Sequence, residues 1–452
     1  MKTIFLLLLS LITLPVFAQD AVIAVGKAGD EKDKLVVDDP QVTGLTGDQK
    51  SLALELTEIL RNDFAFYKHK FETVDYFDKG KNSYSTPAIE KWKGHGITYF
   101  VASDVSPQGS GLEARYKTYS VLTGKEIFSA SFRINKEGLR NSAHSIADSI
   151  YRAMTGKASI FTTKILFVSD RTTTKKSEIL KELYLMDFDG RRVEKLTSFN
   201  SVVISPSVSP DNSRIMFSLI SDHKEVSRNR VRTVKNIDLK MLDLRSDKIS
   251  TLSSKPGMNS GAIFSASGNS AYLTLSFSGN ADIYEMDLGT KQMKKVTAHY
   301  ADDVDPSVTR DGRLMTFLSN RPGKAHIYTM DLSAQEKNVN RVSFVGQFNA
   351  TPRFSPDGKE IVFSSWVDNG FDLYRIDSTG ANLSRLTKNF GSNEEPFYSP
   401  DGEFIVFTSK KMVSKREAAQ DVFIMNREGE VVGQLTQNFG RCFSPQWTNI
   451  TK

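Results

Sequence analysis

A repeated unit in the C-terminal part of the chain constrains the fold more than any other feature. The unit is most complete at residues 352–387, which run from a Pro-x-(bulky apolar) start through an Asp-Gly pair and two apolar runs to a Leu-Thr pair. Related starts recur every 44 to 56 residues. The starts are Pro206-Ser207-Val208, Ala262-Ile263-Phe264, Pro306-Ser307-Val308, Pro352-Arg353-Phe354, Pro396-Phe397-Tyr398 and Pro445-Gln446-Trp447.

Two further positions recur at fixed spacing from these starts. Six residues after each of the first five starts stands a residue that tolerates positive φ, which predicts a hairpin turn between two apolar runs. Nine residues before each start stands a small hydroxyl residue. The turn residues are Asn212, Gly268, Gly312, Gly358 and Gly402, and the hydroxyl residues are Thr197, Ser253, Thr297, Ser343, Thr387 and Thr436.

Six units of four short strands predict a six-bladed β-propeller over residues 158–452. We name the strands of a blade A to D, innermost first. The first strand run, residues 164–168, has no start before it, and the chain ends just after the start at Trp447. We therefore expect the C-terminal strand to supply strand A of blade 1, which removes the open edges of an unclosed ring.

The first eighteen residues have the pattern of a secretory signal peptide. A single Lys2, an apolar run and a small residue at Ala18 predict export with cleavage after Ala18. The single cysteine, Cys442, cannot form an internal disulfide. A formal charge of +6, with no stripe of cations and aromatics, argues against nucleic acid as a partner.

Residues 19–157 predict a small α/β domain ahead of the propeller. Apolar side chains at helical spacing indicate helices at 46–63 and 138–154, and strands are expected at 97–101, 113–121 and 127–134. On the second helix His144 and Asp148 are four residues apart, so we expect them to pair on its surface.

The second helix and the junction after it carry a family resemblance. Residues 139–151, with Thr155-Gly156 and Phe161-Thr162-Thr163-Lys164-Ile165, resemble the TolB family, the periplasmic components of the Tol-Pal envelope system. Together with the signal peptide and the six repeats, the resemblance covers nearly the whole chain. Blade 3 departs from the pattern at Ala262 and at residues 265–268.

The resemblance implies a non-enzymatic interaction protein with two partners. The propeller is expected to bind the lipoprotein Pal through the D-to-A loops around its channel, and the segment after the cleavage site is expected to bind TolA, for outer-membrane integrity and constriction at cell division. No cofactor is expected, and the protein is expected to be a monomer that meets membranes only through its partners. The residues implied for Pal are Met258, Asn259, Asp303, Asp305, Asn349, Glu394 and Glu395, and those implied for TolA are Asp20, Val22, Ile23 and Val25.

The sequence carries no catalytic motif that would favour an enzyme. It has no Gly-x-Ser-x-Gly elbow and no His-Glu-x-x-His helix. A carboxylate-rich loop with His299, Asp302 and Asp303 is the best metal candidate, as a lyase-type propeller would require, although three acidic residues in a loop are often only solvated. The alternative function is therefore a propeller lyase or peptidase-accessory protein that acts on an exported substrate.

Charge is distributed unevenly among the loops expected on the D-to-A face. The B-to-C loops are long in blades 1, 2 and 6 and carry many cations, whereas the D-to-A loops of the other arc carry acidic residues, so the channel mouth is expected to be bipolar. The chain enters blade 1 on the Asp-Gly side, so the N-terminal domain is expected near that side. The basic residues are Lys175, Lys176, Lys181, Lys224, Arg228, Arg230, Arg232, Lys235, Lys410, Lys411, Lys415 and Arg416.

Overall fold

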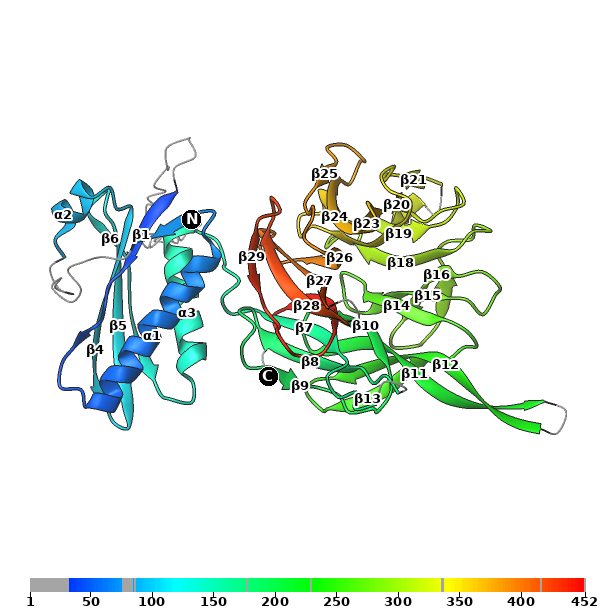
Figure 1. Ribbon diagram of the computed structural model, residues 1–452, viewed down its shortest axis with the longest axis horizontal. Helices are drawn as coiled ribbons and strands as arrows, with labels where there is room; N and C mark the ends of the chain where they lie inside the picture. The colour runs from blue at the N-terminus through cyan, green and yellow to red at the C-terminus, as the bar shows by residue number, and fades with distance from the viewer. Residues whose placement is uncertain are drawn as a thin grey trace, which may run out of the picture.

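The computed structural model of the protein describes residues 32–74, 84, 87–175, 178–227, 230–334, 337–414 and 417–450 (Figure 1). An N-terminal α/β unit lies beside a larger ring of β-sheets. Among the described residues, none of the helices has the length and apolar character needed to cross a membrane. The expected signal peptide and the segment expected to bind TolA lie outside the described residues.

A mixed sheet with the order β3-β1-β4-β5-β6 forms the N-terminal unit, and β2 pairs with β4. Helices α1 and α3 pack on one face of the sheet, and α2 covers part of the other face, where Trp92 stacks on Phe100. The elements are β1 (Asp33–Val37), β2 (Gln41–Val42), α1 (Gly47–Phe66), β3 (Phe71–Thr73), α2 (Ile89–Gly94), β4 (Tyr99–Gln108), β5 (Gly111–Ser120), β6 (Lys125–Ile134) and α3 (Leu139–Thr155).

Local sequence explains where the two long helices begin and end. Thr46 and Gln49 form a reciprocal capping box that satisfies backbone N–H groups at the start of α1. Gly156, with φ of 71°, ends α3 in the left-handed conformation that glycine adopts without strain. Both predicted helices and the three predicted strands are confirmed, whereas β1, β2, β3 and α2 were missed because they are short.

Six four-stranded sheets form the propeller predicted from the repeats. Blade 1 consists of β30 (Cys442–Thr448), β7 (Lys164–Ser169), β8 (Glu182–Asp187) and β9 (Glu194–Lys195). Blade 2 consists of β10 (Val203–Val208), β11 (Arg214–Ser227), β12 (Arg230–Asp243) and β13 (Lys248–Ser253). Blade 3 consists of β14 (Asn259–Phe264), β15 (Ser270–Leu275), β16 (Asp282–Asp287) and β17 (Met293–Lys295).

The remaining blades follow the same order along the chain. Blade 4 consists of β18 (Asp303–Val308), β19 (Leu314–Ser319), β20 (His326–Asp331) and β21 (Asn340–Arg341), with a 3-10 turn η1 (Leu332–Ala334). Blade 5 consists of β22 (Asn349–Phe354), β23 (Glu360–Val367), β24 (Gly370–Asp377) and β25 (Ser384–Arg385). Blade 6 consists of β26 (Ser392–Tyr398), β27 (Phe404–Ser414), β28 (Glu417–Asn426) and β29 (Val431–Gln434).

The two ends of the ring meet in blade 1, as predicted. Strand β30 pairs antiparallel with β7, with Cys442 opposite Ser169 and Trp447 opposite Ile165. The indole N–H of Trp447 donates to Thr163 Oγ1 at 2.6 Å. The ring therefore closes through one sheet built from both ends of the propeller sequence.

The repeated hydroxyl residues connect strand D to strand C within a blade. In five blades the hydroxyl oxygen accepts a hydrogen bond of 2.8 to 3.0 Å from a backbone N–H near the start of strand C. Their constant spacing is thus explained by a buried link inside each blade. The pairs are Leu183 with Thr197, Ile283 with Thr297, Ile327 with Ser343, Leu373 with Thr387 and Val422 with Thr436.

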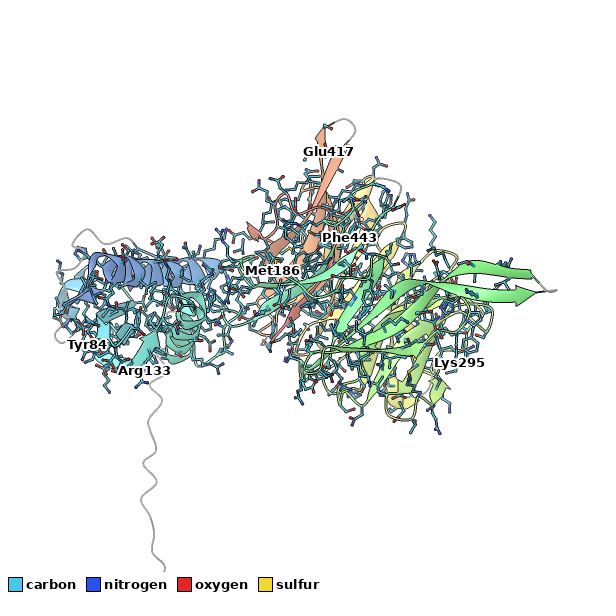
Figure 2. All side chains as sticks on the ribbon, turned by 90° about the horizontal axis from the view of Figure 1, so that it is seen from below. Tyr84, Arg133, Met186, Lys295, Glu417 and Phe443 are labelled. Atoms are coloured by element: carbon cyan, nitrogen blue, oxygen red, sulfur yellow. The ribbon has the colours of Figure 1, made fainter. Side chains whose placement is uncertain are left out.

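The prediction of long B-to-C loops in blades 2 and 6 is wrong. Strands β11 and β12 pair continuously from Arg214 opposite Asp243 to Ser227 opposite Arg230, and β27 and β28 pair as far as Ser414 opposite Glu417. Figure 2 shows both ribbons leaving the body of the propeller in different directions. The charged residues that suggested loops therefore lie mostly on paired strands.

Aromatic side chains join the N-terminal unit to the propeller. Tyr67 packs edge-on against Phe404, with ring centroids 4.8 Å apart, and its hydroxyl donates to Asp401 Oδ2 at 2.6 Å. Lys70 forms an ion pair of 2.7 Å with Glu403. These propeller residues belong to the Asp-Gly turn of blade 6 and the start of the next strand, so the N-terminal unit contacts the Asp-Gly side, as predicted.

The expected surface pair of His144 and Asp148 is wrong. His144 is buried at the junction, and its Nδ1 lies 2.9 Å from Asp63 Oδ2. Asp148 instead accepts hydrogen bonds from Arg152 and from Ser159. One apolar core runs through both units at this junction, so the division at residue 157 into separate domains stays a prediction.

Candidate binding face

Each innermost strand of the propeller contains a β-bulge next to the channel. One residue in each bulge has positive φ, the left-handed backbone conformation. The pairing register of strands A and B shifts around this residue, from the residue before it to the second residue after it. Five of the six left-handed residues are not glycine, so each carries a backbone strain of about 1 to 3 kcal/mol. The six residues are Ser205, Gly261, Asp305, Thr351, Glu395 and Ser444, with φ between 47° and 59°.

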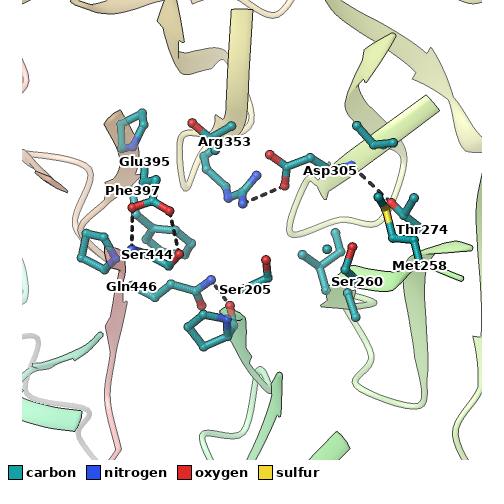
Figure 3. A pocket seen from close by; sticks show the side chains of 18 residues that line it. Ser205, Met258, Ser260, Thr274, Asp305, Arg353, Glu395, Phe397, Ser444 and Gln446 are labelled. Atoms are coloured by element: carbon teal, nitrogen blue, oxygen red, sulfur yellow. Dashed lines mark hydrogen bonds and ion pairs between the residues drawn. The ribbon is translucent and has the colours of Figure 1, made fainter. Parts of the chain in front are cut away.

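The six left-handed residues together line one mouth of the central channel, a cavity of about 270 Å³ (Figure 3). We call the face with this mouth, which carries the D-to-A and B-to-C loops, the mouth face. The opposite face, with the Asp-Gly turns, is the turn face. A second cavity of about 630 Å³ opens on the turn face, and Ile263, Arg353, Phe397 and Gln446 lie between the two cavities.

Charged groups in the mouth are held by neighbouring blades. Arg353 of blade 5 donates to Asp305 Oδ1 of blade 4 at 3.0 Å (Figure 3). Glu395 of blade 6 accepts hydrogen bonds from the backbone N–H and the hydroxyl of Ser444 of blade 1, at 2.6 and 2.7 Å. These contacts across blades orient the side chains before any ligand arrives, as a binding site requires.

The structure divides the seven residues that the sequence implied for Pal. Met258, Asp305 and Glu395 line the mouth. Glu394 is partly buried beside them, and burial, followed by the charge of Glu395, raises the pKa of its carboxyl group. These four residues remain candidates for direct contact.

Asn259, Asp303 and Asn349 do not lie on the surface, and the expectation that they contact a partner is corrected. Asn259 donates to the carbonyl groups of Ile237 and Lys255, at 2.9 and 2.7 Å. The carboxylate of Asp303 is fully buried and pairs with Arg321 at 2.8 Å. Asn349 is fully buried and bonds to the chain around it. All three stand at the first position of strand A, where they tie that strand to neighbouring loops.

The expected bipolar mouth is only partly present. Lys181 and Lys411 lie over aromatic rings, 3.4 Å from the ring centroid of Phe443 and 3.6 Å from that of Phe390, and burial lowers the pKa of both amines. On the ribbon of blade 2, Arg232 and Lys235 pair with acidic residues. Lys175, Lys224 and Lys410 belong to the same arc, whereas Lys176, Arg228, Lys415, Arg416 and the side chain of Arg230 lie outside the described residues.

The proposed metal ligands around His299 are held by separate partners. His299 Nδ1 accepts from Ala301 N–H, and the carboxylate of Asp302 accepts from Ala281 N–H. Asp303 is held by its ion pair with Arg321, so the three side chains have separate partners and do not form a shared pocket. Within the described ranges, a different group, Asp63, His144 and Asp189, brings potential ligand atoms close enough for one ion, but Arg140 already pairs with Asp189.

Sequence reasoning missed most of the left-handed ring and Arg353. The available signal was the residue immediately before each repeat start, which in every unit is the left-handed one. It was not recognised because those residue types differ from blade to blade, and only their backbone conformation is shared.

The family model described as TolB beta propeller domain matches residues 151–366 and 347–448. A TolB homolog from Chlorobium luteolum is 26% identical over 432 residues, covering 95% of this chain and 92% of that protein. The Tol-Pal system protein TolB of Roseobacter denitrificans is 30% identical over 224 residues, covering 48% of this chain and about half, 49%, of that protein. The crystal structure of TolB from Acinetobacter baumannii has the same fold, with a TM-score of 0.76 at 24% identity over 93% of this chain and 97% of that one. The chain therefore belongs to the TolB β-propeller family.

Proposed function

We propose that this protein is a non-enzymatic, periplasmic component of a Tol-Pal system, which acts in outer-membrane integrity and in constriction at cell division. It binds the lipoprotein Pal through the mouth face and TolA through the segment that follows the signal peptide. Family membership supports this proposal, and so does the name of the Roseobacter relative, a Tol-Pal system protein.

The observation that carries the Pal proposal is the position of the channel mouth relative to the N-terminal unit. That unit packs on the turn face, through Asp401 and Glu403 of blade 6 and Asp189 of blade 1. The mouth, with its strained backbone and oriented charges, lies at the other end of the same strands. A partner can therefore reach it without displacing the N-terminal unit.

The contact set that we propose for Pal is narrower than the one the sequence implied. Met258, Asp305, Glu394 and Glu395 are retained, and Arg353 is added because it lines the mouth beside Asp305. Substitution of Asn259, Asp303 or Asn349, which are buried at the start of strand A, would weaken Pal binding only by disturbing the fold.

A charge substitution at the mouth tests the Pal proposal. Glu395→Lys should lower the affinity for the soluble domain of Pal at least tenfold, measured by titration calorimetry, and should change its dependence on salt. The matched control is Lys359→Glu, an exposed charge on the turn face, which should leave affinity unchanged. Equal affinities of the Glu395 variant and the wild type, with unchanged melting temperatures, would refute this placement.

The TolA proposal concerns Asp20, Val22, Ile23 and Val25, which remain outside the described residues. An extended apolar segment can add a strand to the edge of a partner's sheet. Deletion of residues 19–27 should abolish TolA capture and leave the melting temperature and Pal affinity nearly unchanged. A large fall in melting temperature would show that the segment is a structural strand instead.

A further inference from the structure

We propose that the mouth face binds its protein partner through a second contact, an aromatic groove on blades 4 and 5 that receives an apolar side chain. This inference rests on the proposed function, because it assigns the groove to the same partner, Pal. It extends the partner's footprint outward from the channel, over blades 4 and 5.

Exposed aromatic side chains gather in this arc. In the described part of the chain, the exposed large apolar residues include five aromatic side chains. Four lie in the B-to-C and D-to-A loops of blades 3 to 5, and the fifth, Trp366, lies near the end of β23 beside the B-to-C turn of blade 5. Aromatic residues concentrated on one face of a protein mark an interaction site, since scattered single exposures are the ordinary case. The five are Phe277, Tyr300, Phe344, Phe348 and Trp366.

Two of these side chains, with Phe371, form a hollow of about 540 Å³. Trp366 lies edge-on to Phe371, with ring centroids 5.1 Å apart, across the tight turn between β23 and β24. The backbone N–H of Trp366 donates to the carbonyl of Phe348 at 2.7 Å, so the loop between β21 and β22 is fixed to the hairpin of blade 5. The groove is thus preformed on a rigid support, which lowers the entropy cost of binding.

The groove is continuous with the channel mouth. A hollow of about 360 Å³ between them shares Phe348 and Asn320 with the groove, and Met258 and Val304 with the mouth. Because the three hollows follow one another across blades 3 to 5, a partner seated on the mouth would also cover the groove.

The groove lining indicates what kind of side chain it receives. Lys324 is the one charged residue of its lining, which otherwise consists of aromatic, amide and small residues. An uncharged aliphatic or aromatic side chain of the partner fits this environment. The amide of Gln347 can form a hydrogen bond with the partner's backbone next to that side chain. Tryptophan in such a position is the residue type most often found to dominate binding energy.

Substitutions in the groove test the proposal. Trp366→Ala should lower Pal affinity at least tenfold, and Phe348→Ala should lower it in the same direction. The matched control is Phe344→Ala, which removes an aromatic side chain that is 72% exposed on the same face but does not line the groove. Melting temperatures should stay within a few degrees, because the truncated rings are 37% and 43% exposed in the wild type.

Tryptophan fluorescence gives a second readout that does not depend on affinity. Of the three tryptophans of the chain, Trp92 and Trp447 are buried and Trp366 is exposed, so quenching by acrylamide reports on the groove. We expect Pal to protect this signal, taken as the difference between the wild type and Trp366→Phe. If the wild type does not bind Pal, the proposed function fails. If it binds Pal while Trp366 remains as accessible as before and Trp366→Ala binds normally, the groove assignment alone is overturned.

Other occupants are distinguished in the same experiment. If protection of Trp366 rises with protein concentration in the absence of Pal, and sedimentation shows self-association, the groove binds a second copy of this chain. Protection by soluble peptidoglycan fragments without Pal would assign it to a glycan. Either result overturns the proposal.

Discussion

Removal of one hydroxyl group, by Tyr67→Phe, should weaken the junction between the N-terminal unit and the propeller. The Tyr67 side chain is fully buried, and its hydroxyl donates to Asp401 of blade 6 and accepts from the backbone N–H of Ile160. Burial, followed by the charge of Asp401, raises the pKa of Tyr67 well above its ordinary value, so the group is a donor throughout the physiological range.

The size of the effect follows from the two groups that the variant leaves behind. The ring keeps its packing against Phe404 and Phe161, so no cavity term is expected. The fully buried N–H of Ile160 loses its acceptor, which costs about 1 to 3 kcal/mol, and the charged hydrogen bond to Asp401 adds about 1 kcal/mol because that carboxylate is partly hydrated. The free energy of unfolding should fall by about 2 to 4 kcal/mol.

Urea unfolding followed by circular dichroism measures this difference. The matched control is Tyr151→Phe, in the same aromatic cluster, with ring centroids 4.5 Å from Tyr67. The hydroxyl of Tyr151 accepts from Lys70, which keeps its ion pair with Glu403 in that variant, so a loss below about 1 kcal/mol is expected. If the Tyr67 and Tyr151 variants were equally stable, the contribution of the Tyr67 hydroxyl to the junction would be refuted.

Three further predictions concern closure of the ring, the buried junction and the start of strand A. Trp447→Ala should lower the free energy of unfolding by about 3 to 5 kcal/mol in one cooperative transition, and a separate early transition of blade 1 would contradict closure through this residue. Burial raises the pKa of Asp63 to about 6, against the opposing hydrogen bond from His144. The native chain therefore holds this proton more tightly than the unfolded chain, and stability from this group is complete below pH 4 and lost as the pH rises through 6. Relative to Asp63→Asn, the wild type should lose about 3 kcal/mol between pH 4 and 7 in denaturant titrations, and a constant difference would exclude this group as the cause. Asp303→Lys should lower the melting temperature by about 10 °C because it places a second cation, in a buried position, against the partly buried Arg321, so an unchanged melting curve would contradict the ion pair.

Most of the fold could be predicted because its signals are local. The turn at Gly358 needs a residue that adopts positive φ, and the end of α3 at Gly156 needs the same property. The helices at residues 46–63 and 138–154 follow from apolar spacing along the chain. Ring closure could be predicted by counting the repeats. The last repeat has only its strand A, and the first has only strands B to D, so the two had to pair.

The loop prediction for blades 2 and 6 was wrong because a run of charged residues does not by itself indicate a loop. The cations of residues 219–236 suggested a loop, yet the two segments pair as a ribbon up to Ser227 and Arg230, because backbone pairing does not depend on the charge of exposed side chains. Short elements such as β1 were missed because a few residues carry too little periodicity to be recognised.

Tertiary packing alone decided which polar residues form the candidate site. Asp303 and Asp305 are two residues apart in one strand, but the bulge between β18 and β19 turns Asp305 toward the channel while Asp303 is buried against Arg321. Phe348 and Trp366 meet where β22 pairs with β23 in blade 5, but the loop with Lys324 completes the groove only because blade 4 packs beside blade 5. Such contacts depend on how whole sheets pack against each other. The repeat specifies each blade through local spacing, so it does not determine these contacts.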